Sequence, residues 1–328
     1  MKPNIAFVTG GYSGEAIISY KSAITILQHL DSTKYNIYKI DITTSGWYYE
    51  SSIGVKQLVD KNDFSIQVDN KKVRFDAILI GIHGTPGEDG KLQGYFDMLH
   101  IPYTSCDVAT SALTFNKRYT VAVAAFAGIQ VAKSVHLFKG DVADIQQILT
   151  QLQLPVFVKP NNGGSSIGMS KVMHADNLQE AIEKAFKEDD QILIEEYISG
   201  REFTVGVFKT KNAIKVLPIT EIIPKKDFFD YEAKYTAGMS TEVTPANLEE
   251  SIMHKMQSCA KKIYAIFNCR GIVRIDFIYN EKMQQPYLLE INTVPGQTEA
   301  SIVPQQVTAM GWTLTDFYST LLNEALKK

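Results

Sequence analysis

Short apolar runs alternate with amphipathic segments over the first hundred residues. Residues 5–8 form a buried-strand pattern that stops at Gly10-Gly11, and residues 15–29 fit a helix. Apolar runs at 35–42 and 77–82 predict two further strands. Strands alternating with helices favour a parallel, doubly wound sheet, whose ligand crevice lies at the carboxyl ends of its strands. Gly10-Gly11 and His83-Gly84 fall at those ends.

The pattern changes after residue 103. A strand at 156–160, a Gly/Ser-rich loop at 161–168 and a strand at 192–197 predict a small α+β unit. Helices are expected at 116–127 and 177–187. From residue 198 onward the chain is mainly strands with one helix. The predicted strands are 202–208, 213–222, 271–279 and 287–292, and the helix is 248–267.

These segments divide the chain into three predicted domains, at residues 1–103, 104–197 and 198–328. The last one contains a polar, aromatic-rich stretch at 224–245 that does not fit a core strand. A loop of that length inside a compact domain is usually a functional lid or disordered. We therefore expect an α/β protein, α+β in parts, with its site where the three domains meet.

Composition narrows the possible partners. The 328 residues carry 33 Lys+Arg against 36 Asp+Glu, without the cationic excess expected of a general nucleic-acid binder. The three cysteines form no CxxC pair and suggest a reducing compartment. The first residues are too short an apolar run for a signal peptide, and no stretch approaches the roughly 18 apolar residues of a membrane span. We expect a cytoplasmic protein that binds neither nucleic acid nor membrane.

The most informative polar residues lie on two neighbouring predicted strands. Alternate side chains of a strand share a face, so Arg274 and Asp276 point one way, as do Glu290 and Asn292. A hairpin of these strands would gather two carboxylates, an amide and an arginine. Such oxygen ligands suit Mg²⁺ held jointly with phosphates. The alternative is a solvated sheet face with a surface salt bridge.

Two glycine-containing loops could hold an anion. Lys159 closes an apolar strand and is followed by glycines whose backbone N–H groups could bind phosphate, although no Walker A motif occurs. The alternative is an ordinary hairpin loop, and Lys117 taken alone is an exposed helical lysine. The loop at 10–15 resembles a dinucleotide loop but lacks GxGxxG spacing. Its Glu15 could equally be a capping carboxylate that the helix dipole favours.

Taken together and in order, these motifs resemble the D-alanine–D-alanine ligases of the ATP-grasp fold. The resemblance covers nearly the whole chain and implies an ATP-grasp fold with an N-terminal Rossmann-like domain. The motifs are GGYSGE at 10–15, HGTPGEDG at 83–90, FNK at 115–117, VKP at 158–160, GSSIGM at 164–169, IEEY at 194–197, YEAKY at 231–235, RIDF at 274–277 and EINTVPG at 290–296.

The resemblance also implies ligands and site residues. ATP would lie between the second and third domains, and two Mg²⁺, for which Mn²⁺ can substitute, would be held by Asp276, Glu290 and Asn292. The implied ATP-binding residues are Lys117, Lys159, Ser166, Glu195, Glu196, Ile198, Glu202 and Lys234. The implied catalytic residues are Glu15, Ser165, Tyr235, Arg274 and Gly296, and the substrate-binding residues are His83, Ser301 and Ile302.

By the same resemblance, the reaction is the joining of two D-alanines through an acyl phosphate for peptidoglycan synthesis, in a homodimer. Tyr235 goes with dipeptide rather than ester formation. The chain departs from the family pattern at Ala16-Ile17-Ile18, where an arginine–glutamate pair is common, and at Ala300, where a histidine is usual. The alternatives are another ATP-grasp carboxylate–amine ligase, a nucleotide-binding regulatory protein that has lost catalysis, and a dehydrogenase.

Overall fold

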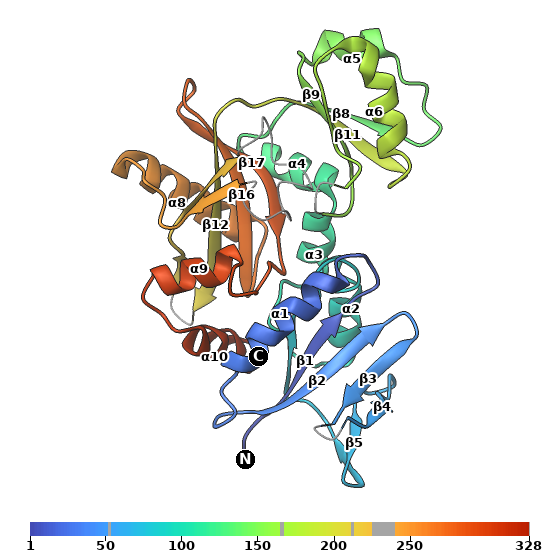
Figure 1. Ribbon diagram of the computed structural model, residues 1–328, viewed down its shortest axis with the longest axis vertical. Coiled ribbons are helices and arrows are strands. Elements are labelled where there is room, and N and C mark those ends of the chain that lie inside the picture. Colours follow the sequence, from blue (N-terminus) through green and yellow to red (C-terminus); the bar gives the residue numbers. More distant parts are fainter. Residues whose placement is uncertain (52–53, 165–166, 211–212, 225–239, 328) are drawn as a thin grey trace.

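The computed structural model describes residues 1–51, 54–164, 167–210, 213–224 and 240–327. Its elements form three bodies stacked along the long axis of the molecule (Figure 1). The N-terminal sheet lies at one end, a small sheet at the other, and the C-terminal sheet between them. Within the described residues, no helix combines the length and the apolarity needed to cross a membrane.

The N-terminal sheet has the strand order β4-β3-β2-β1-β7. β1 (Asn4–Gly10) pairs in parallel with β2 (Asn36–Thr43) and with β7 (Ala77–Ile80), which confirms the predicted parallel unit. The strands β3 (Gly46–Glu50) and β4 (Lys56–Leu58) extend it antiparallel. A separate hairpin contains β5 (Ile66–Val68) and β6 (Lys71–Val73).

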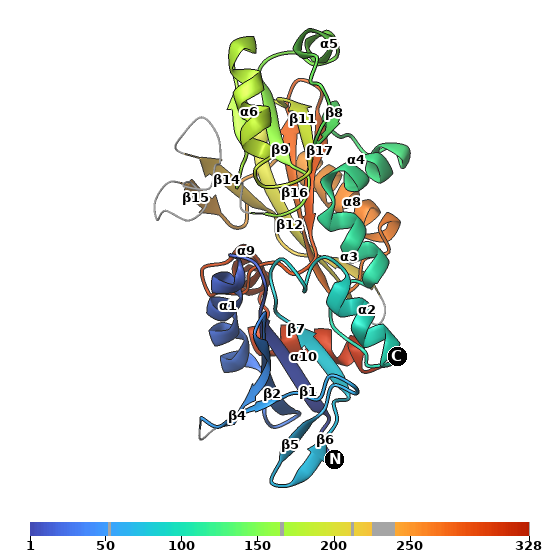
Figure 2. The ribbon, with the colours of Figure 1, turned by 90° about the vertical axis from the view of Figure 1, so that its right-hand side faces the viewer.

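Alternation along β1 sends its side chains into two different cores. Ile5 and Phe7 pack with α1 (Ala16–His29) and with α10 (Leu314–Ala325), while Ala6 and Val8 face α2 (Lys91–Met98). The last helix of the chain therefore returns to the first sheet, as Figure 2 shows. Burial of both faces explains why the strand is an unbroken apolar run.

The small sheet is antiparallel, in the order β10-β9-β11-β8. Its strands are β8 (Ser134–Phe138), β9 (Val156–Pro160), β10 (Ser170–Val172) and β11 (Gln191–Glu196). The helices α5 (Ile145–Gln151) and α6 (Leu178–Ala185), with the short η1 (Ala175–Asn177), complete this unit. The predicted α+β unit is confirmed.

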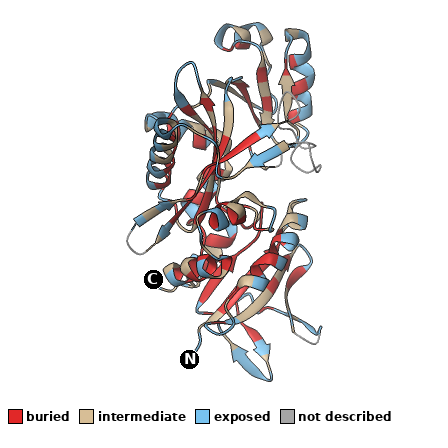
Figure 3. Cartoon of the chain, turned by 60° about the vertical axis from the view of Figure 1, so that its left-hand side comes forward, coloured by how far each residue is buried: buried red, intermediate tan, exposed pale blue. Residues whose placement is uncertain are grey.

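The C-terminal sheet has the order β15-β14-β12-β16-β17, with β13 also paired to β12. Its central strand, β12 (Arg201–Thr210), and its partner β16 (Ile272–Asn280) are buried along most of their length (Figure 3). The same unit contains β17 (Gln285–Asn292), α8 (Glu250–Ile266) and α9 (Ile302–Ala309).

The single strand predicted over 213–222 is wrong. The chain forms β13 (Ala213–Val216) and β14 (Thr220–Pro224), separated by Pro218, which has no N–H to donate to a ladder. The stretch expected to be a loop up to residue 245 ends in another strand, β15 (Ser240–Val243), paired with β14. Residues 225–239 of that stretch lie outside the described residues.

Two helices that follow the N-terminal sheet pack on the C-terminal one. They are α3 (Val108–Phe115), capped by Asp107, and α4 (Lys117–Phe126), capped by Asn116. Ala124 and Leu113 share a core with residues of β12, β16 and α8. The division of the chain at residues 103 and 197 stays a prediction.

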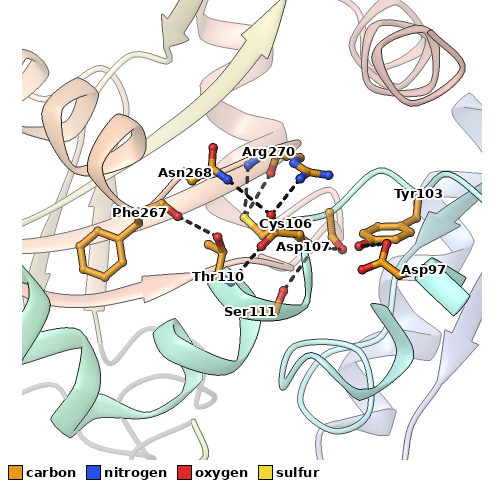
Figure 4. A network of polar contacts seen from close by, with 10 residues as sticks. Asp97, Tyr103, Cys106, Asp107, Thr110, Ser111, Phe267, Asn268 and Arg270 are labelled. Carbon is orange, nitrogen blue, oxygen red and sulfur yellow. Dashed lines mark hydrogen bonds and ion pairs between the residues drawn. The ribbon is translucent and has the colours of Figure 1, made fainter. Parts of the chain in front are cut away.

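A polar network fastens the start of α3 to the turn between α8 and β16 (Figure 4). Arg270 Nη2 lies 2.8 Å from Asp107 Oδ2, and the Arg270 N–H donates to Cys106 Sγ at 3.3 Å. Thr110 Oγ1 donates to the carbonyl of Phe267 at 2.7 Å. Gly271, at φ +61°, lies directly against the Thr104 carbonyl. The segment 104–110 is thus held to the C-terminal unit at several points.

Candidate active site

The two polar strands pair as the sequence predicts. In the β16–β17 hairpin, Arg274 lies opposite Asn292 and Asp276 opposite Glu290. The intervening Ile275 is fully buried in the core below. A shift of register after Asp276 bends the ladder at the point where the carboxylates meet. One face of the hairpin therefore carries all four polar side chains.

Asp276 is the centre of this face. Its carboxylate accepts hydrogen bonds from Arg274 Nε at 2.9 Å and Nη2 at 2.8 Å, and from Asn292 Nδ2 at 3.2 Å. The Thr204 hydroxyl of β12 donates a further bond to it. Arg274 Nη2 also lies 3.8 Å from Glu290 Oε1. Because the ion pair between Arg274 and Asp276 is bidentate and largely buried, it fixes both side chains.

The donor set on the hairpin fits a hard divalent cation. Asp276 and Glu290 supply carboxylate oxygens and Asn292 an amide oxygen. Among the described residues, no group of three or more histidine, cysteine, aspartate and glutamate side chains is placed to hold a metal ion. Two carboxylates are what Mg²⁺ usually takes from protein when phosphates complete its shell.

The two predicted phosphate-binding lysines lie near the glycine loop. Lys117 Nζ donates to the Gly163 carbonyl at 2.6 Å, and its backbone N–H to Asn161. Lys159 Nζ lies 2.5 Å from Glu195 Oε2; Glu195 is buried and Lys159 is half-buried. The resemblance implies phosphate contacts for Lys159 and adenine contacts for Glu195, yet here the two residues form one ion pair across β9 and β11.

The other described residues that the resemblance implies as ATP contacts lie on β11, on β12 or between these strands. Glu196 ends β11, and its carboxylate accepts the Lys133 N–H at 3.0 Å. Ile198 is half-buried in the connection to β12, and Glu202 lies on β12 opposite Ile222. Ser165, Ser166, Lys234 and Tyr235 lie outside the described residues.

Glu15, at the start of α1, lies between two glycine loops. A Cβ atom added to Gly84 would collide with its Oε2, and one added to Gly164 would lie 2.7 Å from its Oε1. The first loop belongs to the N-terminal body and the second to the small sheet. Glycine at both positions gives the carboxylate room, and the carboxylate marks the point where the two bodies meet.

His83 is buried and both of its ring nitrogens have protein partners. Nδ1 lies 2.6 Å from the Val294 carbonyl and Nε2 lies 3.0 Å from Ser22 Oγ. Burial lowers the pKa of His83 to about 4, so the ring is neutral near pH 7. His83 therefore positions the turn around Val294 through its ring, with Nδ1 donating to that carbonyl.

Glu88 is a half-buried carboxyl to which the sequence assigned no role. Its oxygens accept the backbone N–H of Gly84 at 2.7 Å and of Val294 at 3.0 Å. Burial, and next the charge of Glu15, raise the pKa of Glu88 to about 8. Its place in the HGTPGEDG motif was the only signal that could have pointed to it.

The turn after β17 brings the last predicted residues together. A Cβ atom on Gly296 would lie 3.0 Å from Ser301 Oγ, which accepts the Thr298 N–H at 3.0 Å. Ile302 is the first residue of α9. The Gln297 N–H donates to Ser22 Oγ at 3.1 Å, so this turn too is tied to α1.

A cavity of about 40 Å³ lies where these groups converge. It is bounded by the N-terminal loops, the start of α4, the glycine loop and the end of β17. Its charged and amide-bearing lining residues are Glu15, Glu88, Lys117, Glu290 and Asn292. The arrangement places carboxylates suited to a cation opposite a lysine and backbone N–H groups suited to an anion, as phosphoryl transfer requires.

Comparisons with known proteins agree with this geometry. Family models described as D-ala D-ala ligase N-terminus and C-terminus match residues 4–106 and 117–323. A D-alanine–D-alanine ligase of Flavobacterium johnsoniae is 45% identical, over 98% of this chain and 99% of its own. The D-Ala:D-Ser ligase VanG of Enterococcus faecalis has a TM-score of 0.88 at 30% identity, covering 98% of this chain and 99% of its own. The D-alanine–D-alanine ligase of Bacillus anthracis complexed with ATP has a TM-score of 0.79 at 26% identity, covering 99% and 98%.

Proposed function

The chain belongs to the D-alanine–D-alanine ligase family, and from this we propose that it joins two D-alanines in an ATP-dependent reaction. The product is D-alanyl-D-alanine, a building block for peptidoglycan. The observation that carries the proposal is the hairpin face of Arg274, Asp276, Glu290 and Asn292 beside Glu15 and the glycine loop. It combines a cation site, an anion site and a separate carboxylate.

The first step converts a poor acyl donor into a good one. The carboxylate of the first D-alanine takes the γ-phosphoryl group of ATP, and ADP leaves. Lys117 and Lys159 contribute positive charge along the phosphates, and Asp276, Glu290 and Asn292 would hold Mg²⁺, which neutralises the developing charge on the phosphoryl oxygens when bound. Glu15 holds the ammonium group of this substrate.

In the second step the neutral amine of the other D-alanine attacks the acyl carbon of the acyl phosphate, the bond from that carbon to the phosphate oxygen breaks, and inorganic phosphate leaves while the amine loses a proton. Negative charge then develops on the carbonyl oxygen, where Arg274 and the Gly296 N–H stabilise it. Asp276 holds Arg274, and the Thr204 hydroxyl holds Asp276, before the reaction begins, so little reorganisation is needed when the charge develops. His83, Glu88 and Ser22 hold the turn that presents Gly296. Ser301, next to Gly296, meets the carboxylate of the second substrate.

The finer assignments complete the proposal. They include Mg²⁺ as the metal, a cytoplasmic location, a homodimer and a lid over 224–245 bearing Lys234 and Tyr235. Ser165, Glu15 and Tyr235 would close the site as a hydrogen-bonded set. The tyrosine at position 235 favours an amine over a hydroxyl as the second nucleophile.

The test is ADP formation from ATP, Mg²⁺ and D-alanine, with the product mass measured. We expect D-alanine-dependent ADP and a dipeptide mass. L-Alanine should give neither, and reactions that pair D-alanine with D-serine or D-lactate measure the strictness of the second subsite. ADP formation that does not depend on D-alanine would reject the proposed function.

A further inference from the structure

The backbone of the turn at 294–298 keeps one hydrogen-bond donor available. Pro295 has no N–H, and three of the other N–H groups of the turn donate to side chains. These three belong to Val294, Gln297 and Thr298, and their acceptors are Glu88, Ser22 and Ser301. Among the described residues, the Gly296 N–H donates to no acceptor, and Gly296 itself is half-buried. A ligand in the site can therefore receive this bond.

The side chain of Gln297 folds back onto its own turn. Its Nε2 donates to the carbonyl oxygen of Pro295 at 3.1 Å, and the Tyr318 hydroxyl lies 3.0 Å from its Oε1. A carbonyl oxygen can only accept, so Nε2 faces Pro295 and Oε1 faces Tyr318. The Tyr318 hydroxyl is then the donor, and burial raises the pKa of Tyr318, which keeps that proton in place. The two partners thus allow the Gln297 amide one orientation.

Both members of this pair are buried. Gln297 is 6% exposed and Tyr318 2% exposed. Tyr318 lies on α10 and belongs to the same core as Ala23 and Ile26 of α1. No water can replace a partner that is lost at such a depth, so removal of the hydroxyl would leave Gln297 Oε1 unsatisfied. The core under the N-terminal sheet therefore holds the side chain that folds onto the turn.

A second chain of hydrogen bonds reaches the turn from α1. Because Ser22 Oγ accepts the Gln297 N–H, its own hydrogen can donate to His83 Nε2, 3.0 Å away. The opposite ring nitrogen, Nδ1, then donates to the Val294 carbonyl at 2.6 Å. Every bond in this chain runs in a consistent direction. The residue that follows Gly296 is therefore held both by its backbone and by its side chain.

We propose that Gln297 and Tyr318 are positioning residues for the Gly296 N–H, which receives the oxyanion of the second step. The Pro295 carbonyl and the Gly296 N–H belong to one planar peptide unit, so a bond that holds the carbonyl also sets the direction of the N–H. A donor stabilises an oxyanion best when it is aimed in advance at the place where charge develops. The proposal rests on the proposed function, which supplies that oxyanion.

Hydrogen exchange followed by mass spectrometry tests whether Tyr318 holds the turn, and it needs no catalysis. Tyr318→Phe keeps the ring and loses the hydroxyl, so the peptide covering 294–298 should exchange its amide hydrogens at least about tenfold faster. Tyr264→Phe is the matched control, because it removes an equally buried hydroxyl, which donates to the Gly271 carbonyl at 2.8 Å in the core around α8. It should leave exchange in the turn unchanged. Unchanged exchange in Tyr318→Phe would overturn the proposal.

Steady-state kinetics tests the effect on the reaction. Tyr318→Phe should lower kcat at least about tenfold and leave the KM for ATP within about twofold, because a misdirected donor weakens the transition state and not nucleotide binding. Tyr264→Phe should change neither constant. Thermal unfolding checks that each variant is folded at the assay temperature. Faster exchange with an unchanged kcat, or a raised KM for ATP as the main effect, would overturn the positioning role.

A double variant tests whether Tyr318 acts through Gln297. Gln297→Met keeps the length of the side chain and removes both of its hydrogen bonds, so it should lower kcat at least as much as Tyr318→Phe. Adding Tyr318→Phe to Gln297→Met should then lower kcat no further, since two residues in one chain of bonds are not additive. A further loss would overturn the link. If the unaltered protein forms no ADP that depends on D-alanine, the proposed function fails, and hydrogen exchange still decides whether Tyr318 holds the turn.

Discussion

At the scale of residues, Asp276 organises the reactive face because it accepts from Arg274, Asn292 and Thr204 at once. The alternation rule predicted this grouping, since the hairpin needs only local pairing. The rule could not predict Glu88, because that residue is in a loop and its burial depends on contact with Val294, some two hundred residues away. Likewise, the ion pair between Lys159 and Glu195 follows from the register of two strands.

Glu290→Gln should lower kcat by more than about 100-fold, because a cation ligand is lost where phosphoryl charge develops. The substitution removes little packing, so the unfolding temperature should change little. Steady-state kinetics over a Mg²⁺ series measures the effect. The matched control is Glu281→Gln, at an exposed glutamate in the turn of the same hairpin. Near-normal turnover with an unchanged Mg²⁺ requirement would contradict the role of Glu290.

Glu88 should make stability depend on pH. Its pKa is raised from 4.5 to about 8, so the folded chain keeps a proton that the unfolded chain releases. The Glu88 contribution to the free energy of unfolding is therefore full below pH 4.5 and is lost as the pH rises to about 8, by up to about 1.4 kcal/mol per pH unit.

Denaturant unfolding at pH 5, 6, 7 and 8 measures this contribution. Glu88→Gln cannot titrate, so the difference in unfolding free energy between the unaltered protein and the variant should change across the window. The subtraction removes the effects of His83 and other groups. A difference that stays constant from pH 5 to 8 would refute the assignment.

At the scale of elements, the prediction succeeded where an apolar run was long or strictly alternating, as in β1, β9 and β16. It missed the three-residue strands β4, β5, β6 and β10, because so short a segment has no period to detect. The break at Pro218 was readable from the sequence, but the apolar residues on both sides of it suggested one continuous strand.

One buried amide joins α9 to the C-terminal sheet, beside the apolar contacts of Val303 and Val307. Gln306 accepts the Gly206 N–H at 3.0 Å and donates to the Thr204 carbonyl and Thr220 Oγ1. Gln306→Ala should cost about 3 kcal/mol of unfolding free energy, because buried polar groups lose their partner. The neighbouring Gln305→Ala, at a half-buried position whose amide bonds Glu242 and the Ala300 carbonyl near the surface, should cost less than about 1 kcal/mol. Equal losses in chemical denaturation would argue against this role of Gln306.

At the scale of the whole molecule, the three stacked bodies follow from the order of patterns along the chain. The contacts that join them do not, because they link residues far apart in sequence. Examples are α10 against the first sheet and Arg270 against Asp107 (Figure 4). Such pairs give no periodic signal, and only the folded chain brings them together.

The joint at Gly271 should tolerate no side chain. A Cβ atom there would collide with the Thr104 carbonyl, and the residue has φ +61°. Gly271→Ala should therefore cost at least about 3 kcal/mol of unfolding free energy. The control is Gly311→Ala, at φ +81° with no atom near its added Cβ, which should cost only about 1 kcal/mol. Thermal and urea unfolding measure the loss of unfolding free energy in both variants. Similar losses would mean that the cost comes from the positive φ alone and not from the collision with the Thr104 carbonyl.

The position of Glu15 between Gly84 and Gly164 limits which substitutions the chain can accept at these two glycines. Gly164 does not need positive φ, so backbone geometry alone would permit alanine there. An added methyl at Gly164 or at Gly84 would, however, displace the same Glu15 carboxylate. Two positions eighty residues apart are therefore under a single constraint. A chain with a side chain at either position must also move Glu15, the acid that we propose to hold the ammonium group of the first substrate.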